Sequence, residues 1–301
     1  MTGGSRARGA GGVDWREVCA RMREAEAEQA ARLGDPEFVL PEDRWALRAK
    51  RFARRVAEEP GLDASAEWIR AQVRPADVVL DVGAGTGRYV RVLAPQVARL
   101  IAVEPSAGMR GELVALIAAE RLANVEVVAG AWPLAGAPRA DVVLCIHVVY
   151  AVADLVPFLE ALDQAARRLC ALVCGMRPPN AVLGSVWETV HGEPRRPLPG
   201  ALEILNLLHQ LGIPANLQLL PRRDDCLRYA DRADALRALR HRLHLMPEPA
   251  RDACLQRAIG TLFDQHPDGS LSIRPVPDDA VLWWDRAGPD RAEPRSPSGG
   301  V

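Results

Sequence analysis

The stretch Val78-Val79-Leu80-Asp81-Val82-Gly83-Ala84-Gly85-Thr86-Gly87 joins a short apolar run to a turn that has glycine at every second position. Such a run leading into a glycine-rich turn is typical of a buried parallel strand followed by a helix. Glycine lets the backbone approach a ligand closely. The N-terminus of the following helix offers unpaired N–H groups to a carboxylate or a phosphate. We therefore expect a nucleotide or nucleoside site in this turn.

The glycine spacing separates two classes of ligand. A dinucleotide site is typified by G-x-G-x-x-G, but Arg88 occupies the place of that third glycine. Asp81, just before the turn, disfavours a pyrophosphate and suits a cationic amine. S-adenosylmethionine carries an ammonium, a sulfonium and a carboxylate, so the pattern favours this methyl donor over a dinucleotide.

An acidic residue follows at the distance that both ligand classes require. Glu104 ends the second predicted strand, 23 residues after Asp81, near the roughly 20-residue offset of an acid that binds ribose hydroxyls. A carboxylate that accepts two hydroxyl hydrogen bonds orients a nucleoside strongly. Glu104 is therefore the predicted ribose ligand, with a simple helix-capping role as the alternative.

Strands and helices are predicted to alternate around this motif. Strands at 78–80, 100–103, 125–128, 142–146 and 171–174 are separated by helices that run to about residue 94, to residue 122 and over 155–169. Helices at 13–32, 42–58 and 64–73 come before. After the fifth strand we expect a loop at 178–200 with a short helix at 183–190, a helix at 202–211 and a strand at 216–220. Two more helices follow at 233–245 and 250–265, and terminal strands at 271–273 and 280–284. Alternation of this kind predicts an α/β fold with a doubly wound parallel sheet.

At these motifs the chain resembles the class I S-adenosylmethionine-dependent methyltransferases, especially those that act on small molecules. The resemblance covers about Arg44 to Cys174 and weakens toward Trp284. It implies a Rossmann-like, mostly parallel seven-stranded sheet whose last strand is antiparallel, with helical N-terminal and C-terminal cap insertions. The expected divisions are a disordered tail at 1–12, a helical cap at 13–75, a methyltransferase domain at 76–287 with insertions at about 176–200 and 222–270, and a disordered tail at 288–301.

The resemblance also assigns a donor site. Glu104-Pro105-Ser106-x-x-Met109 is similar to the family's motif after its second strand, which implies that Pro105 and Met109 flank the adenine. The family often has an aspartate after Gly130, whereas this chain has Ala131-Trp132, so the backbone or Trp132 must contact the adenine. The full predicted set is Asp81, Gly83, Ala84, Gly85, Thr86, Gly87, Glu104, Pro105, Met109, Ala131, Trp132, Ile146 and His147.

Two residues after the fourth strand are the catalytic candidates. His147 is either a general base for an acceptor O–H or N–H or a residue that lines the donor pocket. Tyr150 either contacts the acceptor or packs in the core. Displacement at the sulfonium methyl needs mainly an acceptor held in line, so positioning supplies most of the acceleration.

Five other residues have a functional and a structural interpretation. Trp45 and Arg48 either form a lid over the donor, or Trp45 packs in the core while Arg48 lies on a solvated helix face. His191 is catalytic or makes a local hydrogen bond. His241 and His244 are too few ligands for a metal, and no metal site is expected.

Bulk composition excludes several classes of protein. The 38 basic and 39 acidic residues give a net charge of −1, so no nucleic-acid partner is expected. Met1 to Gly12 has no apolar core and does not read as a signal peptide. No apolar run approaches the roughly 20 residues of a membrane span. The six cysteines are interpreted as buried free thiols. We expect a cytoplasmic monomer or homodimer without membrane contact.

Three functions remain open from the sequence. The first is methyl transfer from S-adenosylmethionine to a small-molecule acceptor. The second is methylation of RNA or protein, which needs an open basic groove; the neutral charge and the lack of an Asn/Asp-Pro-Pro-Tyr-like motif after the fourth strand count against it. The third is a non-catalytic S-adenosylmethionine-binding protein on the same fold.

Overall fold

The fold is that of a computed structural model of residues 1–301, which describes residues 12–33, 43, 45–58, 63–221, 228–273 and 278–286. The predicted terminal tails lie outside the described residues except for Gly12. Glu42, the first residue of the second predicted helix, and Cys226, one of the six cysteines, also lie outside the described residues.

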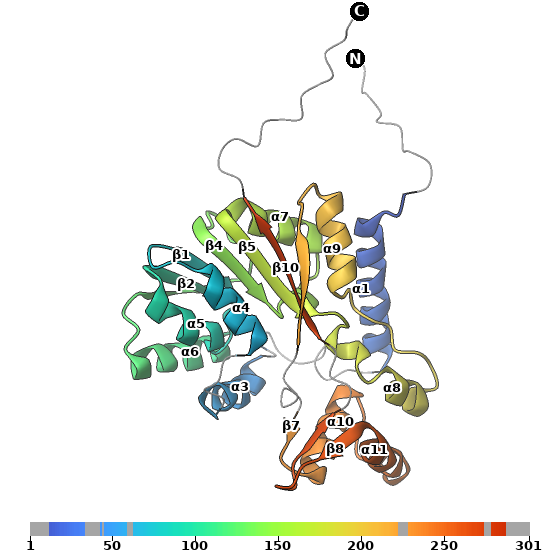
Figure 1. The fold of residues 1–301 in the computed structure, drawn as a ribbon. Helices are drawn as coiled ribbons and strands as arrows, with labels where there is room; N and C mark the ends of the chain where they lie inside the picture. Colours follow the sequence, from blue (N-terminus) through green and yellow to red (C-terminus); the bar gives the residue numbers. More distant parts are fainter. Residues whose placement is uncertain are drawn as a thin grey trace, which may run out of the picture.

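Seven of the described strands form one central sheet in the order β3-β2-β1-β4-β5-β10-β6 (Figure 1). Their bounds are β1 Val78–Val82, β2 Arg99–Glu104, β3 Val125–Ala129, β4 Ala140–Ile146, β5 Ala166–Gly175, β6 Asn216–Leu220 and β10 Asp279–Asp285. β10 runs antiparallel to both of its neighbours, and the pairs from β3 to β5 are parallel. The predicted fold class and the antiparallel last strand are confirmed.

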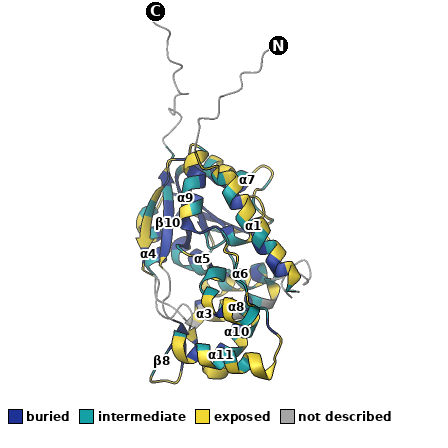
Figure 2. Ribbon diagram, turned by 90° about the vertical axis from the view of Figure 1, so that its right-hand side faces the viewer, coloured by how far each residue is buried: buried dark blue, intermediate teal, exposed yellow. Residues whose placement is uncertain are grey.

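Helices cover both faces of this sheet, and each face has its own apolar core. One layer contains α1 Trp15–Arg32, α7 Leu155–Ala165 and α9 Ala201–Gln210. The other contains α4 Ala64–Gln72, α5 Arg88–Leu93 and α6 Ala107–Glu120. Figure 2 shows the buried strands between helices whose outer surfaces are exposed. The near-continuous apolar strands follow from this arrangement, because a sheet covered on both faces leaves few positions for polar side chains.

A smaller layer lies beyond the carboxyl ends of the central strands (Figure 1). It contains α8 Gly184–His191, α10 Arg232–Arg242, α11 Pro249–Leu262 and a three-stranded sheet of β7 Arg228–Tyr229, β9 Leu271–Ile273 and β8 Phe263–Gln265. Its core is separate from the other two and is built around Trp187, Leu239 and Leu255. In the chain, most of this layer is inserted between β6 and β10. α3 Ala46–Glu58 packs against α6.

Three sequence predictions differ from the observed elements. The helix predicted over 155–169 ends at Ala165, because Leu169 already pairs with Val142 of β4 and Asp285 of β10. The helix predicted to Gln265 ends at Leu262, since the next three residues pair with β9. The strand at 271–273 belongs to the small sheet and not to the central one. In the first two cases strand pairing overrides the local helical pattern.

The short connecting helices are η1 Ala94–Gln96, η2 Val149–Ala151 and η3 Pro179–Ala181. No helix in the described part of the chain is long and apolar enough to cross a membrane. Cys19, Cys145, Cys170 and Cys174 are buried free thiols as predicted, whereas Cys254 is half-buried.

Candidate functional site

The glycine-rich turn lies where the strand order reverses, between β1 and its neighbours β2 and β4. Ligands of open α/β sheets bind at the carboxyl ends of strands at such a point. Gly83, Gly85 and Gly87 all have φ between +59° and +94°, the left-handed region that favours glycine. A Cβ on Gly83 would lie 2.4 Å from Val148 Cγ2, whereas a Cβ on Gly85 would have no atom within 4 Å. The turn therefore needs glycine at Gly83 for packing and has open space over Gly85.

Asp81 is a buried acid with an unsatisfied oxygen. Its side chain is 2% exposed, and its Oδ2 atom has no hydrogen-bond partner. Burial, and then the nearby charge of Glu104, raise the pKa of the Asp81 carboxyl to about 7. A carboxylate in this setting is costly unless a cation or a hydrogen-bond donor joins it. The site is therefore chemically suited to a ligand with an ammonium group.

Glu104 ties the end of β2 to the glycine-rich turn. Gly85 N donates to its Oε2 at 2.8 Å, and Ser106 N donates to its Oε1 at 2.9 Å. Burial raises the pKa of Glu104, and the two N–H donors act in the opposite direction. Two acceptor oxygens fixed in this way still have lone pairs for ligand hydroxyls. The carboxylate therefore keeps acceptor capacity for a ligand, and its assignment to the ribose stays a prediction.

The turn after β2 is anchored by two further residues. Arg110 Nη1 donates to the carbonyl oxygens of Glu104 and Pro105 at 2.8 and 2.6 Å. Asp43 Oδ2 accepts from Gly108 N at 3.1 Å. These contacts hold the first turn of α6. The sequence did not single out either residue, because an arginine or aspartate on or beside a helix is normally expected to face solvent.

The other predicted donor-site residues lie at the carboxyl ends of β2, β3 and β4. Met109 is buried, Pro105 and Ala131 are exposed, and Ile146 is half-buried. Trp132 is half-buried and donates from Nε1 to Phe158 O at 3.3 Å. Trp132 thus packs against the core beneath α7. The assignment of these residues to the adenine stays a prediction.

His147 and Tyr150 meet a residue that the sequence analysis missed. His147 has φ of +56° just after β4, and its Nε2 lies 3.5 Å from Asp279 Oδ2 at the start of β10. Its ring stacks on that of Tyr150 with centroids 6.3 Å apart. Tyr150 Oη accepts from Gly175 N at 2.5 Å, and Gly175 is paired with Asp279. The polar network therefore spans the ends of β4, β5 and β10.

The remaining candidates have structural contacts. Arg48 lies over the Trp45 ring at 5.4 Å and approaches His241 Nε2 at 3.4 Å, so it joins α3 to α10. His191 Nε2 is 2.7 Å from Leu243 O, a hydrogen bond that joins the end of α8 to the end of α10. His244 stacks edge-on against Trp187. Among the described residues, no group of three or more metal-binding side chains comes together.

Comparison with known proteins gives a match to one family model and a similar fold. Residues 44–174 match the model of a family described as a methyltransferase domain. An uncharacterized protein of Haemophilus influenzae is 24% identical over 250 residues, which are 82% of this chain and 90% of that protein. The YcgJ protein of Bacillus subtilis has a similar fold, with a TM-score of 0.50 and 16% identity over 73% of this chain and 96% of that one.

Proposed function

We propose that the protein transfers the methyl group of S-adenosylmethionine to a small-molecule acceptor, since residues 44–174 match the model of a family described as a methyltransferase domain and the central sheet has the Rossmann-like strand order. The observation that carries the proposal is the unsatisfied, buried Oδ2 of Asp81, which lies in one site with Glu104 and the open space over Gly85. A dinucleotide has no ammonium to offer Asp81, whereas the methionine part of this donor does.

Each part of the donor has a counterpart among the described residues. Asp81 would bind the ammonium, and Glu104 would accept from the ribose hydroxyls. The backbone of Gly83 to Gly87 would come close to the methionine part, and Met109 would pack against the adenine. The donor would supply a methyl group bound to a sulfonium sulfur. The acceptor would attack the methyl carbon in line with the C–S bond, with the sulfur as the leaving group. The acceptor's lone pair forms the bond to carbon, the C–S pair stays on sulfur, and any acceptor proton leaves to a base.

His147 is the base that this arrangement offers. Its imidazole is one-third exposed, and Asp279 beside it is 7% exposed. The Asp279 carboxylate lies 3.5 Å from Nε2 of the ring, where it can orient the imidazole. The positive φ of His147 and the hydrogen bond from His147 N to Val173 O at 2.8 Å fix the backbone position from which the His147 ring extends. Asp279 is thus a positioning residue for His147.

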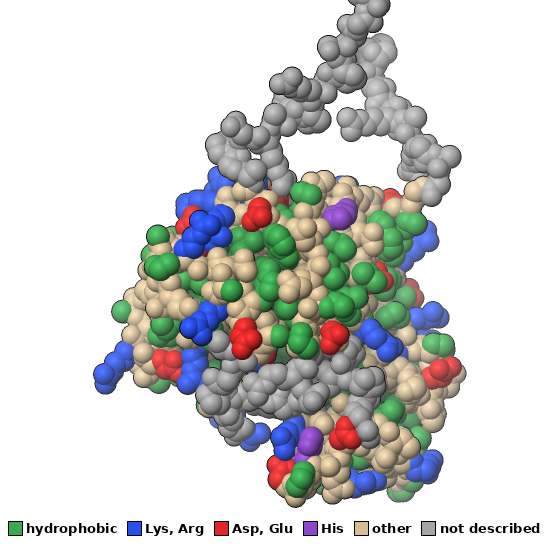
Figure 3. Space-filling model, viewed as in Figure 1, with side chains coloured by type: hydrophobic (Ala, Val, Ile, Leu, Met, Phe, Trp, Pro, Cys, Tyr) green, Lys and Arg blue, Asp and Glu red, His purple; other side chains and the backbone are tan. Residues whose placement is uncertain are grey.

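Charge and shape support a small acceptor. The small layer covers the carboxyl ends of the central strands (Figure 1). On the face seen in Figure 3, basic and acidic side chains are interspersed and form no extended region of one sign. A nucleic-acid groove normally shows a basic stripe. A covered site with mixed surface charge fits a small molecule better than a polymer.

The proposal is tested by calorimetric titration with S-adenosylmethionine and S-adenosylhomocysteine. We expect saturable binding, and Gly85→Ala should weaken it at least tenfold, because the new methyl group enters the open space over the turn. Gly212→Ala is the matched control: it also has positive φ and open space at Cβ, but lies at the end of α9. Both variants should lose a similar ~1 kcal/mol of stability. Absence of binding by the folded wild-type protein would overturn the proposal.

A second prediction concerns the base. With an acceptor that must lose a proton, His147→Asn should lower the rate constant of the methyl-transfer step by about 10²-fold and leave the affinity for S-adenosylhomocysteine within threefold. Asp279→Asn should have a smaller effect in the same direction. His266→Asn, in the turn between β8 and β9, is the control. The measurement is single-turnover kinetics with a radiolabelled methyl group. An unchanged rate in His147→Asn would mean that this residue only lines the pocket.

A further inference from the structure

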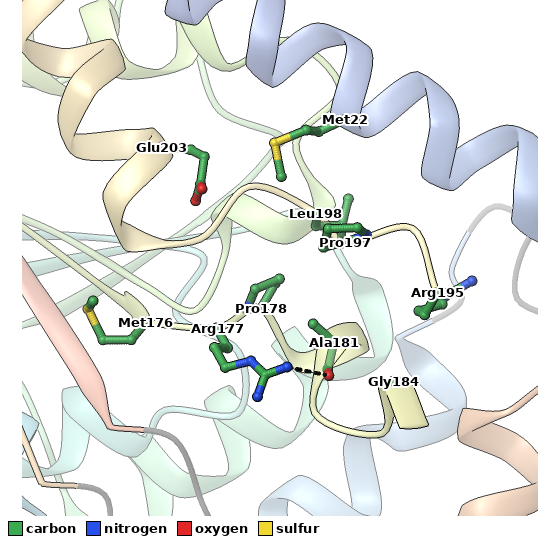
Figure 4. A pocket seen from close by; sticks show the side chains of 10 residues that line it. All are labelled: Met22, Met176, Arg177, Pro178, Ala181, Gly184, Arg195, Pro197, Leu198 and Glu203. Carbon is green, nitrogen blue, oxygen red and sulfur yellow. Dashed lines mark hydrogen bonds between the residues drawn. The ribbon is translucent and has the colours of Figure 1, made fainter. Parts of the chain in front are cut away.

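A cavity of about 330 Å³ lies next to the carboxyl end of β5, between α1, α9 and the segment that leads into α8 (Figure 4). Its volume is at the small end of the range for ligand pockets. Most of its lining is apolar: Met22, Met176, Pro178, Ala181, Pro197 and Leu198.

Two of the three charged residues at this cavity already have strong partners. Arg195 Nη2 is 2.8 Å from Glu26 Oε1, and its guanidinium lies 3.9 Å over the ring of Trp187. Glu203 Oε2 accepts from Gly200 N at 2.9 Å and caps α9. These contacts fix the wall of the cavity and leave little capacity for a ligand charge.

Arg177 is the third charged residue and differs from the other two. It is exposed, and its guanidinium makes one weak contact, from Nη2 to Ala181 O at 3.5 Å. No carboxylate in the described residues lies within ion-pair distance of it. Its guanidinium therefore keeps the planar set of donors that binds a carboxylate or a phosphate. An arginine in this state at the edge of an apolar cavity is typical of a site for an amphipathic anion.

The cavity is connected to the predicted reaction site. Met176 and Arg177 directly follow Gly175, whose N–H donates to Tyr150 Oη. Tyr150 stacks on His147, and Val148 between them packs over Gly83 of the donor turn. A molecule in the cavity thus lies against the strand end next to the one that carries His147.

We propose that this cavity binds the methyl acceptor, and that the acceptor is an apolar molecule of about bicyclic size with one anionic group bound by Arg177. This inference rests on the proposed function, because it assigns a ligand class to the same site. The anion serves binding, while a separate nucleophilic atom of the acceptor takes the methyl group as described above. The apolar body fills the space between Met22, Met176 and Leu198.

The test uses 2-naphthoate as probe and its neutral amide, 2-naphthamide, in calorimetric titrations with the full chain and saturating S-adenosylhomocysteine. We expect naphthoate to bind at least tenfold more tightly than the amide. Arg177→Gln should remove this preference, whereas Arg121→Gln, an exposed arginine at the end of α6, should leave it unchanged. Equal binding of the two probes, or a preference that survives in Arg177→Gln, would overturn the role of Arg177.

A second variant tests the cavity itself. Gly184 lines it, and a Cβ at this position has no atom within 4 Å, so Gly184→Leu fills the space without a backbone clash. We expect this variant to lose naphthoate binding and to keep the wild-type melting temperature and affinity for S-adenosylhomocysteine. Gly260→Leu, on α11 with equally open space, is the control.

The outcomes separate the two proposals. S-adenosylhomocysteine binding without naphthoate binding would overturn the cavity inference and leave the methyltransferase proposal standing. Naphthoate binding that depends on Arg177 and Gly184, without any binding of S-adenosylhomocysteine, would support the anion site and contradict the proposed function.

Discussion

Asp81→Asn is expected to produce a ligand-free protein that is more stable than the wild type at pH 8 and that no longer binds S-adenosylmethionine measurably. The reason is the setting of the carboxylate, which is buried beside Glu104 with an oxygen that has no partner. An amide of the same shape carries no charge, so it removes the cost of the buried charge together with the group that would bind the ammonium.

The effect on stability should depend on pH in a defined direction. The pKa of Asp81 is raised from 3.8 to about 7 in the folded protein. Well below pH 4 the carboxyl is protonated in both the folded and the unfolded chain, so it contributes no difference to the stability. Between pH 4 and 7 the unfolded chain releases its proton first, so the wild type loses stability as the pH rises. Above pH 7 this loss of folding stability reaches at most about 4 kcal/mol.

We therefore expect the stability gap between Asp81→Asn and the wild type to be small at pH 4, to grow toward pH 7 and then to level off. Because the buried amide must also find partners, a gain of about 2 kcal/mol at pH 8 is the realistic expectation. Thermal and urea unfolding across this pH range measure it, with the half-buried Glu112→Gln as control. A gap that stays constant with pH would contradict the raised pKa of Asp81.

Glu104→Gln is expected to lower the affinity for S-adenosylhomocysteine by 100-fold or more. Hydrogen bonds to a charged group contribute about 1.5–3 kcal/mol each, and the carboxylate would accept two from the ribose. In the variant, an amide nitrogen also faces one of the N–H donors of Gly85 and Ser106, so the turn loses a contact.

Titration calorimetry with S-adenosylhomocysteine measures the loss, and the melting temperature of the ligand-free protein separates it from damage to the turn. Glu112→Gln on α6 again serves as the matched control. An affinity within threefold of the wild type would mean that Glu104 orders the glycine-rich turn without contacting the nucleoside.

The central strands and the donor turn were predictable because their signals are local. Val78 to Gly87 carries both the apolar run and the glycine spacing, and Glu104 follows at a fixed distance along the chain. The position of Ser106 as the N-cap of α6 is also a local property. These residues lie within a short stretch whose geometry depends mainly on its own sequence and on the adjacent strands.

The rest of the site depends on contacts between distant parts of the chain. Asp279 reaches His147 only because β10 pairs with β5, and its sole sequence signal was an acid before a terminal apolar run. Arg167 and Arg168 continue a helical pattern, but the ladder with β4 places them in β5, where Arg168 pairs with Asp77. The cavity at Arg177 lies in a proline-rich segment without periodicity, so its lining could not be read from the sequence.

The place of β10 in the sheet has a consequence for how the protein is made. This strand follows all other described strands in the chain, yet it lies between β5 and β6 and pairs with both. During synthesis on the ribosome, the edge of β5 stays open until the segment after residue 278 has emerged. Open edges favour aggregation. The acid beside His147 arrives with the same strand, so a nascent chain stopped before Asp279 has neither a closed sheet nor a complete reaction site.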